Sequence, residues 1–262
     1  MLRKLMKYEF MAMGRIFLPL FGALIVISIV NGILGSFGLD TPAFIGIVVA
    51  ILLIVGIVVI TFILIIQRFW TNLLSNEGYL MMTLPVSTDL IILSKLFTAS
   101  VLSVISTIVV LLSILIMTTT GISLADITEG IRFVFGVIPF NLPQMWILII
   151  QIIIALVLSM FTNILLLYVC MSLSMVSDKY RWLVAIGFYI AITTALQIIV
   201  TVVIAIGAFS GTFSAIERFL LSFPTFGQIN LFALIINLFS AVLCVAFYIT
   251  TRYMLKNRLN LQ

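Results

Sequence analysis

Six stretches of the chain, each at least about 20 residues long, consist almost entirely of apolar side chains. An α-helix needs about that many apolar residues to cross the hydrocarbon core of a bilayer. Each stretch is flanked by charged residues, Pro, Gly or aromatic residues typical of the membrane interface. The sequence therefore predicts an all-α, polytopic membrane protein with six transmembrane helices, at residues 16–38, 43–66, 90–117, 145–171, 182–208 and 231–251.

The composition leads to the same class of protein. Hydrophobic residues make up 64% of the 262 positions and charged residues only 8%, whereas a soluble domain carries roughly 25% charged residues. A polar exterior cannot be built from so few charges, so lipid is the expected solvent. No repeat and no separate soluble segment interrupts the pattern, and we expect a single integral membrane domain over residues 1–262.

The Lys and Arg residues predict the orientation, because cytoplasmic loops of membrane proteins are enriched in them. Only Arg132 and Arg218, of the 13 Lys and Arg residues, fall on one side of the predicted spans. The others share the opposite side: Arg3, Lys4, Lys7, Arg15, Arg68, Lys95, Lys179, Arg181, Arg252, Lys256 and Arg258. We therefore expect a multi-pass membrane protein with both termini in the cytoplasm. The net charge of +5 is explained by this bias and by anionic lipid, without nucleic acid.

Two charged residues stand out near the predicted cytoplasmic side. Residues before the first span form an amphipathic helix with the basic side chains on one face, and it is expected to lie in the headgroup plane. Glu9 lies in the apolar face of that helix, where it either contacts Arg68 or Arg15 or extends to water. Lys95 lies near the start of the third span, and its long side chain is expected to extend to the interface.

Several kinds of chemistry are excluded by the residues that are missing. The chain contains no histidine, which excludes Ser-His-Asp and Cys-His catalysis and HExxH metalloprotease sites. No GxxxxGK[ST] run is present, so the chain has no phosphate-binding loop of that kind. Cys170 and Cys244 are interpreted as small apolar residues of the spans instead of a redox pair. We expect no enzyme activity on this chain, and any ATP must be used by a partner.

The segment at residues 67–87, between the second and third spans, is too polar to continue in lipid and too apolar for a free loop. A short helix that ends at Leu84, before Pro85, would present apolar side chains to a partner or rest on the membrane surface. This segment resembles the membrane subunits of ABC-2 type transporters, in particular the small six-span permeases of Gram-positive bacteria. The resemblance is carried by residues 77–87 (EGYLMMTLPVS), Ser94-Lys95, residues 7–10 (KYEF) and Gly14-Arg15.

The resemblance implies a function and a set of partners. In that family the loop after the second span is a cytoplasmic coupling helix that docks on a separate ABC ATPase, which holds the ATP and Mg. Two permease subunits, identical or homologous, form the pathway of an exporter for an amphiphilic peptide, drug or lipid. Residues of this chain that would form the ATPase-facing surface are Glu77, Gly78, Tyr79, Leu80, Thr83, Leu84 and Pro85. Tyr79 and Leu80 would be the apolar anchors and Glu77 a partner for basic residues.

Uncharged polar residues form a stripe on each of three spans, and no Asp, Glu, Arg or Lys lies deep in a span. The stripes either line the path of an amphiphilic cargo or form hydrogen bonds between helices. Their residues are Ser100, Ser103 and Thr107 on the third span; Gln151, Ser159, Thr162 and Asn163 on the fourth; and Thr193, Thr194, Gln197 and Thr201 on the fifth.

Two alternatives to an exporter subunit remain at this point. The first is a membrane scaffold without transport activity, such as an immunity or sensor component. The second is a membrane-embedded enzyme, for which the sequence offers no histidine, paired carboxylates or activated nucleophile.

Overall fold

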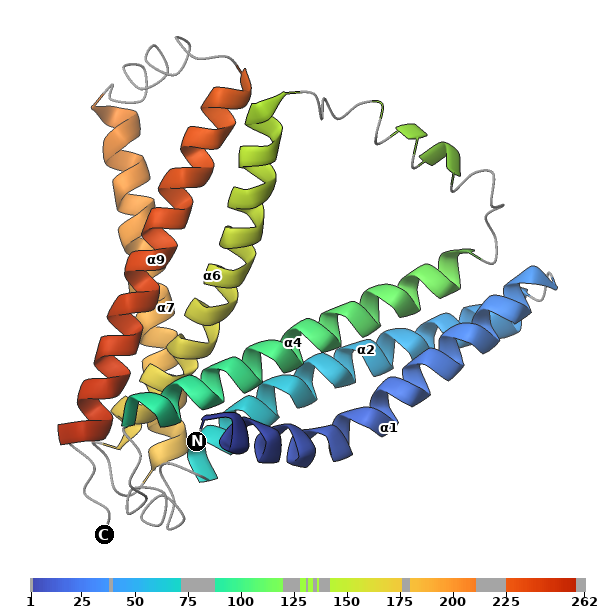
Figure 1. Cartoon of the computed structure of the whole chain (residues 1–262), viewed down its shortest axis with the longest axis horizontal. Coiled ribbons are helices and arrows are strands. Elements are labelled where there is room, and N and C mark those ends of the chain that lie inside the picture. Colours follow the sequence, from blue (N-terminus) through green and yellow to red (C-terminus); the bar gives the residue numbers. More distant parts are fainter. Residues whose placement is uncertain are drawn as a thin grey trace. The chain divides into compact units, whose positions relative to one another are not determined.

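The computed structural model describes residues 2–37, 40–71, 88–119, 128–130, 132–133, 136, 142–175, 180–210 and 225–257. Six long α-helices account for most of this part of the chain (Figure 1). They are α1 (Leu2–Ser36), α2 (Asp40–Phe69), α4 (Thr88–Thr119), α6 (Pro143–Ser174), α7 (Arg181–Phe209) and α9 (Thr225–Asn257). The described ranges contain no β-strand. The prediction of an all-α fold is confirmed.

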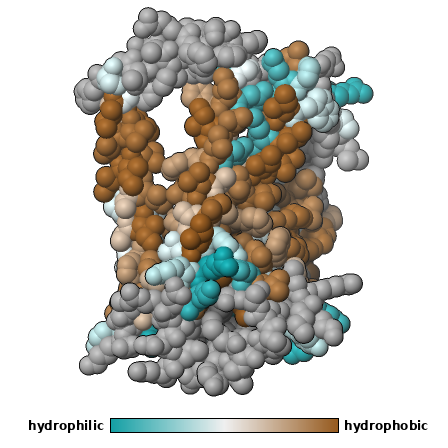
Figure 2. Space-filling view, turned by 60° about the vertical axis from the view of Figure 1, so that its left-hand side comes forward, coloured by the Kyte–Doolittle hydropathy of each residue, from teal (hydrophilic) through white to brown (hydrophobic). Residues whose placement is uncertain are grey.

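All six helices are long and apolar enough to cross a membrane, which confirms the six predicted spans. On the face shown in Figure 2, the surface of the described helices is predominantly apolar, and many large apolar side chains of all six helices are exposed. Such a surface is unfavourable in water and favourable in hydrocarbon, where the helical backbone satisfies its own hydrogen bonds. The chain is a multi-pass membrane protein.

Helix α1 differs in one respect from the expected arrangement. The amphipathic segment at the N-terminus is continuous with the first span, because α1 runs without a break from Leu2 to Ser36. Pro19 lies in the interior of this helix and removes one backbone hydrogen bond, which favours bending. Figure 1 shows the first turns of α1 running at an angle to the rest of the helix.

The helices group into two compact units, residues 1–138 and 139–262. In the first unit α1 packs against both α4 and α2. The buried cluster at its centre consists of Met13, Phe17, Leu64 and Leu102, with Phe10, Phe21 and Ile60 packed against it. This cluster joins side chains of α1, α2 and α4, so α1 is the central element of the unit. The single domain expected from the sequence stays a prediction.

In the second unit α6 is the central element, and it packs most extensively against α9 and less against α7. The C-terminal part of α6 is buried on every side from Ile164 to Met171. A helix that is apolar all round and buried in this way is typical of the inside of a bundle.

Helices α1 and α2 approach each other closely at Gly46. A Cβ atom built at position 46 would lie 2.8 Å from Cγ of Asn31, a residue of α1. In the amide orientation that satisfies both of its polar groups, Asn31 donates to the carbonyl oxygen of Ala43 at 2.7 Å and accepts from the N–H of Ile47 at 3.2 Å. Because glycine leaves room for the amide, one side chain of α1 bonds to the backbone of α2.

This contact predicts a difference between two glycines of α2. Gly46→Ala is expected to lower the free energy of unfolding by about 1–3 kcal/mol, because the methyl group would displace Asn31 from the α2 backbone. Gly56→Ala is the matched control. Apart from the adjoining residues and the nearby backbone of α2 itself, no atom lies within 4 Å of a Cβ atom at position 56, and alanine is favoured over glycine in a helix. Titration of both purified variants with SDS measures the difference. Equal stability of the two variants would show that the α1–α2 contact is not tight.

Candidate functional site

A buried ion pair joins α1 to α4 in the first unit. Nζ of Lys95 lies 2.9 Å from Oε1 of Glu9 and donates a hydrogen bond to it. The side chains of Lys95 and Glu9 are only 3% and 10% exposed. The structure thus pairs Glu9 with Lys95, a residue whose side chain we expected to extend to the interface. The physical reason is that Glu9 supplies a counter-charge inside the bundle, where an isolated ammonium group would be costly.

The same lysine also contacts α2. Its Nζ donates a second hydrogen bond to the backbone carbonyl oxygen of Arg68, at 3.4 Å. Arg68 is in the last turn of α2, whose final carbonyl groups have no partner within the helix. Glu9, Lys95 and the Arg68 carbonyl therefore connect α1, α4 and α2, and we call this group of three the polar joint.

The polar joint is next to both ends of the segment that carries the family resemblance. Helix α2 ends at Phe69 and α4 begins at Thr88. Arg68 is therefore in the last turn before residues 72–87, which we call the 72–87 segment, and Lys95 follows this segment by about two helical turns. The helices before and after residues 72–87 are consequently connected to α1 through Lys95. The predicted ATPase-facing residues themselves lie outside the described residues; they are Glu77, Gly78, Tyr79, Leu80, Thr83, Leu84 and Pro85.

The hydroxyl groups of the polar stripes mostly bond to their own helices. In α4, Ser100 donates to the carbonyl oxygen of Leu96 at 2.7 Å, and Ser103 and Thr107 donate in the same way four residues back. In α7, Thr193 and Thr201 donate to Tyr189 and Gln197 at 2.7 and 2.8 Å. Thr194 and Gln197 are on the same helix. These bonds satisfy the hydroxyl groups locally and leave both interpretations of the α4 and α7 stripes open.

The α6 stripe does contact another helix. Nδ2 of Asn237 in α9 donates to the backbone carbonyl oxygen of Gln151 at 3.1 Å, and Thr162 donates to that of Ser240 at 3.4 Å. Ser159 and Asn163 bond within α6. The side chain of Thr162 therefore takes part in hydrogen bonding between helices, one of the two interpretations we considered, whereas Gln151 accepts through its backbone carbonyl oxygen.

Two asparagines of α9 were not among the predicted site residues, although both bond to α6. Asn230 donates to the backbone carbonyl oxygen of Gln144 at 3.0 Å, and Asn237 makes the equivalent bond to Gln151. Seven residues separate Asn230 from Asn237, and seven also separate Gln144 from Gln151. The spacing of seven residues places the two asparagines on one side of α9. The acceptors are backbone carbonyl oxygens, so the signal present in the sequence is the pair of asparagines.

The described residues show no sign of metal or thiol chemistry. Within them, no group of three or more His, Cys, Asp or Glu side chains is placed to hold a metal ion. Cys170 and Cys244 are both free thiols, the first buried and the second partly buried in apolar helices.

Comparison with models of protein families, with curated proteins and with solved structures found no match to this chain. The family resemblance of residues 77–87 therefore stays a hypothesis, and the function must be inferred from the chain's own residues.

Proposed function

We propose that this chain is the membrane subunit of an ATP-driven ABC exporter that moves an amphiphilic substrate out of the cell. In this proposal a separate cytoplasmic ATPase holds ATP and Mg, and a second permease subunit, identical or homologous, completes the pathway. The observation that carries the proposal is the polar joint. It connects the helices before and after residues 72–87 to α1, so that a movement of this segment would be transmitted to three spans together.

The burial of the polar joint supports this mechanical role. A salt bridge on a surface adds little rigidity, because water competes with both partners. Lys95 and Glu9 are nearly closed off from solvent, where separating the charges is strongly unfavourable. The three helix ends consequently move as one body. ATP binding would close the ATPase, and the segment would pass that movement to α1, α2 and α4.

The types of side chain in the spans favour an amphiphilic substrate over an ion as the transported species. The described part of the chain has one buried ion pair, Lys95 with Glu9, near the helix ends, and uncharged polar stripes elsewhere. Ion-coupled carriers depend on carboxylates or other ionisable groups inside the membrane. An exporter driven by a separate ATPase needs no ionisable group inside the membrane.

Purification of the tagged chain from its host in mild detergent, followed by mass spectrometry of the proteins that accompany it, tests this function. We expect a soluble protein with a phosphate-binding loop and an ABC signature motif in stoichiometric amount. If the intact, inserted chain is recovered without such a protein, the scaffold, immunity or sensor alternative is favoured.

The proposed orientation predicts a labelling pattern. In a background where Cys170 and Cys244 are replaced by alanine, Ser214→Cys is expected to react with a membrane-impermeant maleimide added to intact cells. Ser177→Cys is expected to react only after the cells are opened, because the basic loops stay in the cytoplasm. The reverse pattern would contradict the proposed cytoplasmic termini.

A further inference from the structure

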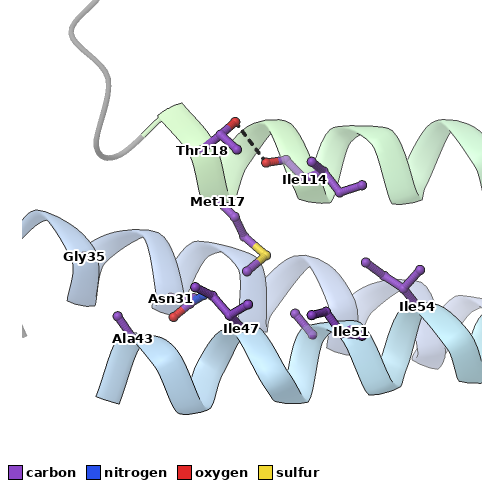
Figure 3. Close-up of a pocket in the computed structure, with 10 residues that line it drawn as sticks. Asn31, Gly35, Ala43, Ile47, Ile51, Ile54, Ile114, Met117 and Thr118 are labelled. Carbon is purple, nitrogen blue, oxygen red and sulfur yellow. Dashed lines mark hydrogen bonds between the residues drawn. The ribbon is translucent and has the colours of Figure 1, made fainter. Parts of the chain in front are cut away.

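A cavity of about 460 Å³ lies between α1, α2 and α4 of the first unit. This volume is within the roughly 300–1,000 Å³ of sites that bind small molecules. Helix α2 contributes one apolar stripe to its wall, and the other two helices close it from the sides (Figure 3). The residues of the α2 stripe are Ala43, Ile47, Ala50, Ile51 and Ile54.

The polar groups of the lining are already satisfied by the protein. The amide of Asn31 bonds to the backbone of α2, as described above. The hydroxyl of Thr118 donates to the carbonyl oxygens of Ile114 and Leu115, at 3.1 and 3.0 Å. Water needs two to four polar partners in order to be retained in a cavity, so this cavity favours an apolar occupant.

The cavity opens toward the surroundings of the helices. Ala50 at its floor is 1% exposed, whereas Ile51 and Ile114 at its sides are 54% and 45% exposed. In Figure 3 the side chain of Met117 extends from α4 toward α1 and α2, across the space between the helices. Because these helices span a membrane, the medium at this opening is lipid hydrocarbon.

The position and length of the cavity match one leaflet of a bilayer. It begins at the helix ends, with Gly35 one residue before the end of α1 and Thr118 one residue before the end of α4. The α2 stripe extends from Ala43 to Ile54, a rise of about 16 Å at 1.5 Å per residue. Half of the hydrocarbon thickness is about 15 Å. These helix ends lie opposite the 72–87 segment along α2, so the leaflet concerned is the one far from that segment.

We propose that this cavity holds one acyl chain of a bilayer phospholipid, with the headgroup at the level of Gly35 and Thr118 and the chain end near Ile54. The apolar stripe contacts the chain along its length, and the flexible side chain of Met117 adapts to it. This site needs neither the ATPase nor transport, so its test is independent of the proposed exporter function.

Photolabelling of the purified chain in bilayers tests the proposal. The probe is a phosphatidylcholine with a diazirine near the end of one acyl chain, and mass spectrometry locates the adducts. We expect several-fold more adducts at Ile51 and Ile54 than at Leu52 and Val55, which lie at the same depth on the same helix and face outward at 66% and 54% exposure. The same lipid with the diazirine on its headgroup is expected to label neither Ile51 nor Ile54.

If the proposal is correct, substitutions that fill the cavity remove the excess of adducts at the lining residues over those at the outward-facing residues. Ala50→Phe places a ring in the cavity, and Ile51→Phe fills its mouth from a side chain that is already half exposed, in case the first variant does not fold. Val58→Phe, also on α2 and 60% exposed, is the matched control and is expected to change nothing.

Equal labelling at lining and outward residues would overturn the proposal, as would labelling that neither filling variant reduces. Labelling by a single-chain alkyl amphiphile but not by the phospholipid would also overturn it, because the occupant would then be a free amphiphile.

Discussion

Replacement of Lys95 by methionine is expected to lower the free energy of unfolding by about 3–5 kcal/mol, the range found when one partner of a buried ion pair is removed. Methionine is close to lysine in length but removes the ammonium group that bonds to the buried carboxylate of Glu9. It also removes the hydrogen bond to the Arg68 carbonyl oxygen. SDS titration of the purified protein in mild-detergent micelles measures the loss.

Two further variants distinguish the effect of the lost charge on stability from the effect of altered packing. The double variant Glu9→Leu/Lys95→Met replaces the pair by apolar side chains of similar size and is expected to recover most of the lost stability. Lys7→Met removes an exposed charge of α1 and is expected to change stability by no more than about 0.5 kcal/mol. If the double variant were as unstable as Lys95→Met, the loss of stability would come from altered packing and not from the loss of the ion pair.

Tyr79→Asp and Leu80→Asp are each expected to reduce the amount of ATPase that is purified with the chain by a factor of ten or more. Apolar anchors at the centre of an interface typically contribute about 2 kcal/mol or more, and about 1.4 kcal/mol corresponds to a factor of ten in affinity. A buried carboxylate at such a position adds a desolvation penalty. Quantitative mass spectrometry of the purified complexes measures the ratio of ATPase to permease.

The stability of the permease itself is the control for these variants. Because the substitutions lie in the loop, the SDS titration midpoint of each variant is expected to equal that of the unmodified chain. Ser75→Ala, in the same loop but outside the predicted ATPase-facing surface, is expected to retain the full amount of ATPase. Unchanged recovery of the ATPase with Tyr79→Asp would show that this loop is not the docking surface.

The sequence was sufficient to predict the class of fold and the number of spans. Length and apolarity alone decide whether a helix can cross a bilayer, and the six long helices agree with the predicted ranges to within several residues, apart from α1. At α1 the pattern of charges indicated a separate amphipathic helix, yet a continuous helix satisfies more backbone hydrogen bonds than a break would. Periodicity reports which face is apolar but not where the helix begins.

The polar joint could not be predicted in the same way. Glu9 and Lys95 are 86 residues apart, and two opposite charges in apolar surroundings show only that each needs a partner. Two other basic residues, Arg68 and Arg15, were equally reasonable by charge. The choice depends on which helices pack together, and the central position of α1 between α2 and α4 has no simple signature in a sequence of nearly uniform apolarity.

The hydrogen bonds from α9 to α6, in contrast to the polar joint, have a signature in the sequence. Asn230 and Asn237 repeat the spacing of Gln144 and Gln151, and this repeat can be recognised in the amino-acid sequence alone. The two asparagines are a local pattern that indicates which side of α9 pairs with another helix. The glutamines accept through backbone carbonyl oxygens, which any residue would offer.

The rate of ATP hydrolysis by the co-purified ATPase, measured alone and together with this chain in lipid vesicles, tests the exporter function most directly. We expect the rate to change when the chain is present and to return to that of the isolated ATPase when the chain carries Tyr79→Asp. A rate that is the same with and without the chain, although both proteins are folded and bound, would contradict the proposed function.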